Sequence, residues 1–240
     1  MVVEVCVASI QSIKNAFKAG ADRIELCSAL GVGGITPSAG LIKEAVHLNL
    51  LPIQCLIRPR EGHFNYSKDE TRIIEQDIIS AKKLGCAGVV LGALTNTFLL
   101  DIELLKNWKK LAGDMKITFH RAFDVVANPK EALEVLIDLG FDRILTSGQQ
   151  EKAMVGLSEL EMWRKQVDER ITIMPGSGIN FENCSEFKKA GFKELHLSGS
   201  SDLPLLYIPE KVNKEISFLH QPIGESNEEI LKKVVRLAKS

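Results

Sequence analysis

The amino-acid sequence predicts an α/β protein, a single (β/α)8 barrel of the TIM type over residues 1–240. One sequence pattern occurs four times: a glycine ends a helix, and the first apolar position of a short strand follows four residues later. Its glycines are Gly20, Gly85, Gly140 and Gly191. They are spaced by roughly 50 to 65 residues, about two strand–helix units, so four copies imply eight units. The length of 240 residues also suits such a barrel, whereas an open doubly wound sheet is the alternative.

In the first half of the chain, short apolar runs predict four strands. They are residues 2–8, 23–26, 52–57 and 88–91. Ser9 is placed to cap the helix after the first strand, and Thr36 followed by Pro37 predicts the start of the second helix. Ser67 and Glu70 form a capping box that starts the third helix. The fourth helix is expected over residues 101–111.

The second half repeats this alternation. Its predicted strands are residues 116–119, 143–145, 171–174 and 194–197. Asn128 before Pro129 predicts the start of the fifth helix, the sixth spans residues 157–167, and Asn180 is placed to cap the seventh. Residues 198–224 show no clean period, and a capped final helix follows, to residue 239.

The composition indicates a soluble globular protein, with 45% hydrophobic and 25% charged residues and a net charge of -1. No long basic run is present to hold a nucleic acid, and no apolar window of about 18 residues could span a membrane. The N-terminus lacks the charged region of a signal peptide, and no nucleotide cofactor motif is evident. Five cysteines, an odd number, fit reduced thiols. We therefore expect a cytoplasmic protein without nucleic-acid or membrane partners.

Side-chain alternation selects the residues at the barrel mouth, where the carboxyl ends of the strands converge. Glu4 and Cys6 share a face of one strand, and Glu25 and Cys27 share a face of the next. We expect the two thiols to lie side by side, although buried cysteines also serve as small apolar residues. The other cysteines, Cys55, Cys86 and Cys184, are interpreted as packing residues.

The same alternation places further polar residues at the mouth. They are Gln54 and Arg58, Thr118 and His120, Ser147, His196 and Ser198. A strand histidine is often a hydrogen-bonded core residue, but two near carboxylates favour a functional site. Because an unpaired buried carboxylate is costly, Glu4 and Glu25 should pair with Arg58, Arg121, a histidine or a ligand.

Arginines and small residues at strand ends favour an anion site. Arg58, Arg60 and Arg121 offer guanidinium groups, which suit carboxylate or phosphate. The loops after the last two strands contain Gly176, Gly178 and Ser198, at the place where barrels often hold a phosphate. Tight turns explain these glycines equally well.

A set of motifs resembles the CutC copper homeostasis family, the barrel protein and not the choline lyase of the same name. The motifs are Glu-Val-Cys (4–6), Gly-Ala-Asp-Arg-Ile-Glu-Leu-Cys-Ser (20–28), Gly-Gly-Ile-Thr-Pro-Ser (33–38), Ile-Arg-Pro-Arg (57–60), Thr-Phe-His-Arg-Ala-Phe-Asp (118–124), Leu-Thr-Ser-Gly (145–148) and Met-Pro-Gly-Ser-Gly (174–178). The resemblance implies a cytosolic, often dimeric TIM-type barrel that takes part in copper homeostasis, with Cys6 and Cys27 as copper ligands. The sequence departs from the family pattern at residues 61–64 and after Ser198.

Two functions from different classes follow. The first is a copper-binding protein, and the expected ion is Cu(I) because soft thiolates select Cu(I). The second is a barrel enzyme of the isomerase or lyase type acting on a small anionic or phosphorylated substrate, with Glu25, His120, Asp124 and His196 as acid–base candidates. No lysine ends a strand where it would form an imine. A binding barrel without turnover is the third possibility.

Overall fold

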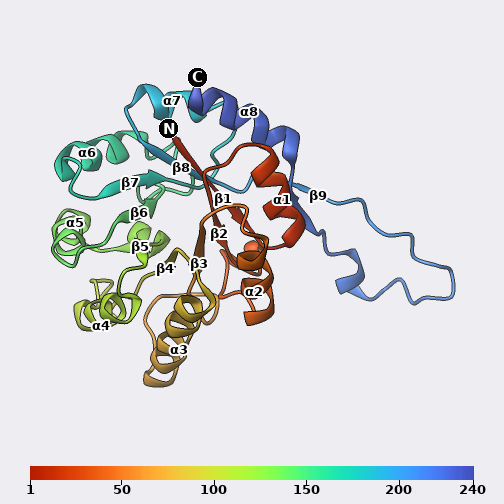
Figure 1. Ribbon diagram of the computed structural model, residues 1–240, viewed down its shortest axis with the longest axis horizontal. Helices are drawn as coiled ribbons and strands as arrows, with labels where there is room; N and C mark the ends of the chain where they lie inside the picture. The colour runs from red at the N-terminus through yellow and green to blue at the C-terminus, as the bar shows by residue number, and fades with distance from the viewer.

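The computed structural model describes residues 1–240, apart from the side chain of Phe218. Eight parallel strands pair in the order β7-β6-β5-β4-β3-β2-β1-β8, and β7 packs against β8 to close the ring. The helices surround this ring (Figure 1), which confirms the predicted (β/α)8 barrel. The strands are β1 (Val2–Val7), β2 (Arg23–Leu26), β3 (Ile53–Leu56), β4 (Gly88–Leu91), β5 (Lys116–Phe119), β6 (Arg143–Thr146), β7 (Thr172–Pro175) and β8 (Glu194–Leu197).

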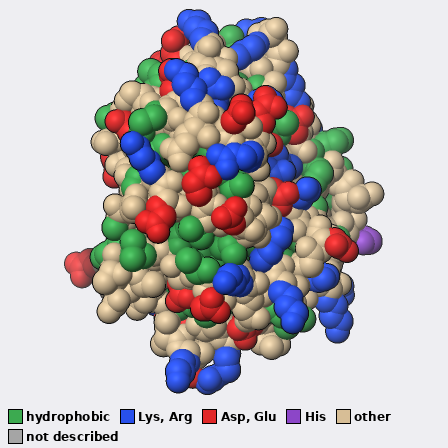
Figure 2. All heavy atoms as spheres, turned by 90° about the vertical axis from the view of Figure 1, so that its left-hand side faces the viewer, with side chains coloured by type: hydrophobic (Ala, Val, Ile, Leu, Met, Phe, Trp, Pro, Cys, Tyr) green, Lys and Arg blue, Asp and Glu red, His purple; other side chains and the backbone are tan. Residues whose placement is uncertain are grey.

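The outer layer consists of eight α-helices. They are α1 (Ile10–Lys18), α2 (Ala39–Leu48), α3 (Lys68–Leu84), α4 (Ile102–Ala112), α5 (Pro129–Asp138), α6 (Leu157–Val167), α7 (Cys184–Lys189) and α8 (Glu228–Lys239). Short 3-10 turns occur at Leu30–Val32, Arg121–Val125 and Ser217–His220. On the face shown in Figure 2, basic and acidic side chains are interspersed, with apolar side chains between them. No helix among the described residues is both long and apolar enough to cross a membrane.

The helix starts confirm some of the capping predictions and correct others. Ser9 accepts a hydrogen bond from the Ser12 amide, and the capping box at the start of α3 is present. The expected cap at Thr36 is wrong, because Ser38 caps α2. Thr36 instead bonds to the strand end at Arg58, whose amide donates to the Thr36 Oγ1 over 2.9 Å. Asn180 Oδ1 accepts the Glu182 and Asn183 amides, so Asn180 caps the turn that leads into α7, while the helix itself begins only after Asn183.

The main apolar core lies between the strands and the helices. Outward-facing strand residues such as Val5 and Leu195 are fully buried there, together with Trp108 and Trp163 from α4 and α6. Cys55, Cys86 and Cys184 belong to this core, as predicted. Since side chains alternate along a strand, the intervening polar residues face the barrel interior. The site therefore lies inside the ring.

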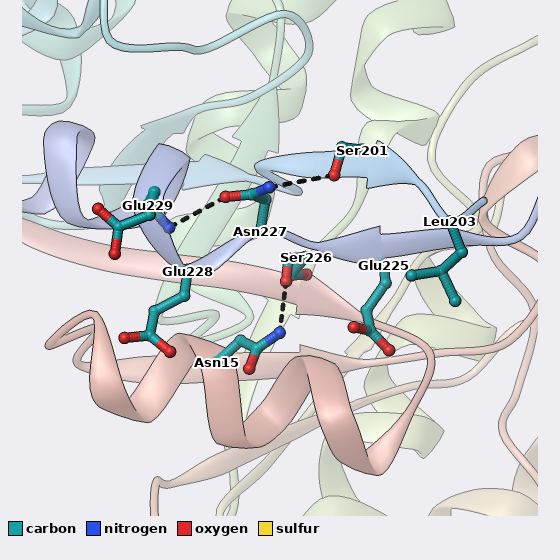
Figure 3. Close-up of a pocket in the computed structure, with 8 residues that line it drawn as sticks. All are labelled: Asn15, Ser201, Leu203, Glu225, Ser226, Asn227, Glu228 and Glu229. Atoms are coloured by element: carbon teal, nitrogen blue, oxygen red, sulfur yellow. Dashed lines mark hydrogen bonds between the residues drawn. The ribbon is translucent and has the colours of Figure 1, made fainter.

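The segment between β8 and α8 contains a small hairpin of β9 (Ser200–Asp202) and β10 (Gly224–Ser226). Between these strands the chain forms an arm, residues 203–223, that extends away from the barrel in Figure 1. The hairpin is attached to α1, because Asn15 Nδ2 donates to the Ser226 carbonyl over 2.9 Å and the Ser226 amide donates to Ser12 Oγ over 3.1 Å. A shallow polar pocket lies at this junction, away from the barrel interior (Figure 3).

Candidate functional site

The strand register brings a thiol, a carboxyl and an imidazole together inside the barrel. Cys6 on β1 lies opposite Glu25 on β2, and Glu4 lies opposite His196 on β8. One donor atom each from Cys6, Glu25 and His196 lies within 4.8 Å of the others. All three residues are buried, with exposed fractions of 6–8%. We call these three residues the Cys6 cluster.

His196 is held between two carboxyl groups. Its Nδ1 lies 2.8 Å from Glu4 Oε1, and its Nε2 lies 3.3 Å from Glu25 Oε2. Burial lowers the pKa of His196, but Cys6, Glu25 and Glu4 outweigh burial and raise it well above its usual value. Burial also raises the pKa of Glu25 to about 7, against the opposing effect of His196. The cluster therefore holds groups suited to proton exchange near neutral pH.

A network of charges supports the Cys6 cluster from the amino-terminal side of the strands. Arg23 Nε donates to Glu4 Oε2 over 2.5 Å, and Arg23 Nη2 donates to Glu194. Arg143 Nε donates to the same Glu194 oxygen over 3.0 Å. Burial would raise the pKa of Glu4, but His196 and Arg23 lower it to about 2. Two arginines thus compensate the buried Glu4 and the partly buried Glu194, which keeps Glu4 ionised and His196 oriented.

Cys27 has a different environment from Cys6. Its thiol donates to the Val7 carbonyl over 3.4 Å, and it packs with Leu56 and Val90 in a small apolar group. Burial, with smaller effects from Glu25 and Cys6, raises the pKa of the Cys27 thiol. Cys27 is not one of the three residues of the Cys6 cluster.

The predicted mouth arginines are each held by their own loops. Arg58 donates from Nη1 and Nη2 to the carbonyls of the β2 and β3 loops, at Val32, Gly34 and Gly62. Arg60 Nε donates to Glu70 over 2.5 Å, and its other nitrogens bond to loop carbonyls.

Arg121 and Asp124 brace the loop after β6. Arg121 donates to Asp124 Oδ2 over 2.7 Å and to Ser147 Oγ over 2.9 Å. Asp124 also accepts hydrogen bonds from Thr146 Oγ1, over 2.5 Å, and from the Ser147 and Gln149 amides. Asp124 is therefore saturated by its own loop partners.

The remaining predicted residues are Gly176, Gly178, Ser198 and His120, and they have different surroundings. Gly176 lies beside the His196 ring, and a Cβ there would lie 2.5 Å from Leu145 Cδ1, so a small residue is needed at this position. Gly178 has a φ of +73° and lies against Lys152, whereas Ser198 Oγ lies 3.2 Å from Ser200 Oγ. His120 directly follows β5, across the interior from the Cys6 cluster, which does not include it.

Sequence reasoning missed Arg23, Arg143 and Glu194 as parts of the site. Their signal was available, because Arg23 stands two residues before Glu25 and Glu194 two before His196, on the same strand faces. The glutamates were expected to pair with mouth arginines or a histidine. The histidine partner is confirmed, since His196 lies within ion-pair distance of both Glu4 and Glu25. The arginine partner of Glu4 is Arg23 and not Arg58 or Arg121.

The fold and the interior define a class of protein: a parallel (β/α)8 barrel with a buried thiol, carboxyl and imidazole cluster between its strands. The family model described as "CutC family" matches residues 1–201, so the chain belongs to the CutC family.

Individual relatives agree with this assignment. A Vibrio cholerae serotype O1 "family protein CutC" is 47% identical over 205 residues, covering 84% of this chain and 81% of the relative. A Pasteurella multocida protein of the same name is 45% identical over 200 residues, covering 83% and 82%. The solved structure of the "Putative Copper Homeostasis Protein CutC" from Streptococcus agalactiae has a TM-score of 0.79 at 34% identity, covering 82% of this chain and 98% of that one. A solved aldolase at 14% identity, with a TM-score of 0.63, shares the fold alone.

Proposed function

We propose that this chain binds copper, as Cu(I), inside the barrel and acts in copper homeostasis. The observation that carries the proposal is the Cys6 cluster, which brings a thiol and an imidazole from separate strands within 4.8 Å. Thiolate sulfur selects Cu(I) and imidazole nitrogen suits copper, so Cys6 and His196 fit the ion, while the Glu25 oxygen is a harder ligand. The Streptococcus agalactiae protein is named a copper homeostasis protein, which supports the role proposed for this chain.

Two versions of this copper site make different predictions. In the first, the ligands come from the Cys6 cluster. In the second, Cys6 and Cys27 provide two thiolates. Since the apolar surroundings of Cys27 disfavour its thiolate, the structure favours the first version.

The test is anaerobic Cu(I) competition against a chromogenic chelator, with Cys6→Ser, His196→Gln and Cys27→Ser compared with the native chain. We expect one Cu(I) per chain in the native protein and its loss in Cys6→Ser and His196→Gln. Unchanged binding in Cys27→Ser supports the first version, and loss there supports the second. Cys184→Ser, in the outer core, is the matched thiol control. Native binding too weak to compete with the chelator, or equal in Cys6→Ser, contradicts the proposal.

A second candidate function is an enzyme of the isomerase or lyase type that acts on a small anionic substrate. One observation favours it: Glu4 Oε1 orients His196, and His196 contacts both Cys6 and Glu25. In many acid–base sites a base lies beside an acid or a nucleophile, and a third group orients the base. Under this proposal Glu25 and His196 transfer protons. The readout is deuterium exchange into candidate carboxylate or phosphate substrates, which Glu25→Gln should abolish.

We also propose that the chain is a cytoplasmic homodimer, with residues 203–223 as the contact to a second copy. This arm carries exposed apolar side chains, including Leu206 at 86% and Tyr207 at 83%. Apolar side chains are also exposed on loops at the barrel mouth, among them Phe98 and Val155 at 51% and 67%, and would complement the arm of a second copy. Light scattering should show a dimer for the native chain and a monomer for Leu206→Asp/Tyr207→Asp, while a dimeric variant would exclude the arm as the contact.

A further inference from the structure

Arg58 is a buried cation without an acidic partner. It lies at the end of β3 with 6% of its surface exposed. Its Nη atoms bond only to main-chain carbonyls, and no described carboxylate forms an ion pair with it. Its Nε–H is buried and lacks a hydrogen-bond partner among the described residues. Burial lowers the pKa of Arg58, because desolvation disfavours its charge. Buried charges are normally paired, so the missing partner of Arg58 points to a ligand.

His120, directly after β5, offers a second unused donor. It is 5% exposed, and its Nδ1 accepts the Ala122 amide over 3.2 Å. An imidazole that accepts at Nδ1 carries its proton at Nε2. This Nε2–H is also buried without a partner among the described residues.

The two donors border the same aromatic ring. The Phe64 ring centroid lies 5.1 Å from Arg58 Cζ and 4.7 Å from the His120 ring centroid. Gly92 directly follows β4, the strand between β3 and β5, and a Cβ at Gly92 would approach the His120 ring to 2.8 Å. The glycine thus lets the His120 ring lie over β4, toward the side where Arg58 lies.

We propose that Arg58 and His120 form a binding site for a small organic monocarboxylate in the barrel mouth. The carboxylate would accept the Arg58 Nε–H and the His120 Nε2–H and supply the negative charge that Arg58 lacks. Phe64 is only partly buried and its loop neighbours are exposed, so displacement of its ring gives access to both donors.

The donor count selects carboxylate over phosphate. The site offers one full positive charge and two free N–H donors, which match the single charge and two oxygens of a carboxylate. A phosphate dianion would leave one charge and several oxygens without partners. On the strand of His120, the inward Thr118 Oγ1 is also buried and without a described partner. Thr118 suits a ligand with a hydroxyl beside the carboxylate, such as glycolate.

This proposal goes beyond copper binding and does not rest on it. The copper proposal depends on Cys6 and His196, whereas the carboxylate proposal depends on Arg58 and His120. Metal competition and carboxylate titration therefore fail independently of each other.

The experiment measures glycolate binding to the full chain by thermal melting and by the 15N signal of the His120 imidazole. Glycolate should raise the Tm in a concentration-dependent way and shift the His120 Nε2 signal. In His120→Phe the concentration needed for the same Tm rise should increase tenfold or more, because a hydrogen bond to a charged group is lost. His47→Phe, an exposed helix position, is the matched control and should respond as the native chain does.

Two comparisons keep the test decisive. His120→Gln retains an N–H near the Nε2 position and should respond more strongly than His120→Phe. Chloride at equal ionic strength should have no comparable effect, and phosphate should be weaker than glycolate. An equal response to chloride or phosphate, an unmoved Nε2 signal, or a full response in His120→Phe would overturn the proposal. If His120→Phe does not fold, the native Nε2 signal alone decides.

Discussion

The barrel interior has two sides, and each contains a buried arginine and a buried histidine. The two sides differ in whether these residues have carboxylate partners. Arg23 and Arg58 are both 6% exposed, and His196 and His120 are 7% and 5% exposed. On the side of β1, β2 and β8, carboxylates surround the buried arginine and histidine. On the side of β3 and β5, no described carboxylate pairs with either residue.

The difference shows that partners, and not burial alone, set the charge of these groups. Burial lowers the pKa of both histidines, but acidic neighbours raise that of His196 well above its usual value. His120, beside Arg58, has its pKa lowered to about 3. The first side is a closed charge network, as expected of a structural frame that also orients the Cys6 cluster. The second side is incomplete without an anion, as expected of a ligand site.

The largest expected effect is on the free energy of unfolding when each arginine is replaced by methionine. Arg23→Met leaves the buried Glu4 and the partly buried Glu194 with one partner fewer each, which should cost about 3–5 kcal/mol. Arg58→Met loses hydrogen bonds to carbonyls but also removes an uncompensated charge, so we expect a loss of about 1–2 kcal/mol. Urea unfolding of both variants measures the difference. A cost for Arg58→Met equal to that for Arg23→Met would show that the two sides are energetically alike.

The next effect is a pH dependence that comes from His120. Between its folded pKa of about 3 and the unfolded value near 6.5, the unfolded chain binds a proton that the folded chain does not. Stability from this group is therefore complete above pH 6.5 and falls as the pH is lowered, by about 2 kcal/mol at pH 5. Glu25, whose pKa burial raises to about 7, has the opposite effect over the same range, so the His120 contribution must be measured as a difference between two chains. In urea unfolding at pH 5 and 7, the change in stability of the native chain should be less favourable than that of His120→Phe by about 2 kcal/mol. Equal changes in the two chains would mean that His120 protonates normally when folded.

Strand alternation and the glycine repeat were sufficient to predict the barrel and the face that carries Cys6, Glu25 and His196. Both patterns can be read within single strand–helix units. In this fold each strand turns one face inward, so alternation along a strand is enough to assign its inner side chains. Arg23 and Glu194 share strand faces with Glu25 and His196, and they were left out only because the prediction considered the carboxyl ends of the strands. The strand register, by contrast, depends on how neighbouring strands pair. It sets Cys6 opposite Glu25, and Cys27 follows two residues after Glu25.

The loops were harder to predict than the strands. Arg58, Arg60 and Arg121 do follow strand ends, but the loop conformation decides which of their donors are free. Arg60 bonds to Glu70 and Arg121 to Asp124, while Arg58 retains one free donor, its Nε–H. The Arg58 side chain bonds to main-chain carbonyls of loops, and the positions of those carbonyls cannot be predicted from the residue pattern. The orphaned donors of Arg58 and His120 could therefore be found only from the structure.

The smallest expected effect is a change in the pKa of His120 when an arginine on one side of the interior or the other is replaced. If the Arg58 charge contributes to the low pKa of His120, Arg58→Met should raise that pKa, but by less than the depression that remains from burial, the larger cause. Arg23→Met, on the other side of the interior, should leave it unchanged. The protonated fraction of His120 between pH 4 and 6, measured by 15N NMR in the native chain and both variants, gives the answer. An equal rise in both variants would mean that the two sides share one electrostatic environment. A rise confined to Arg58→Met would establish Arg58 and His120 as one coupled site, whose charge the carboxylate ligand would complete.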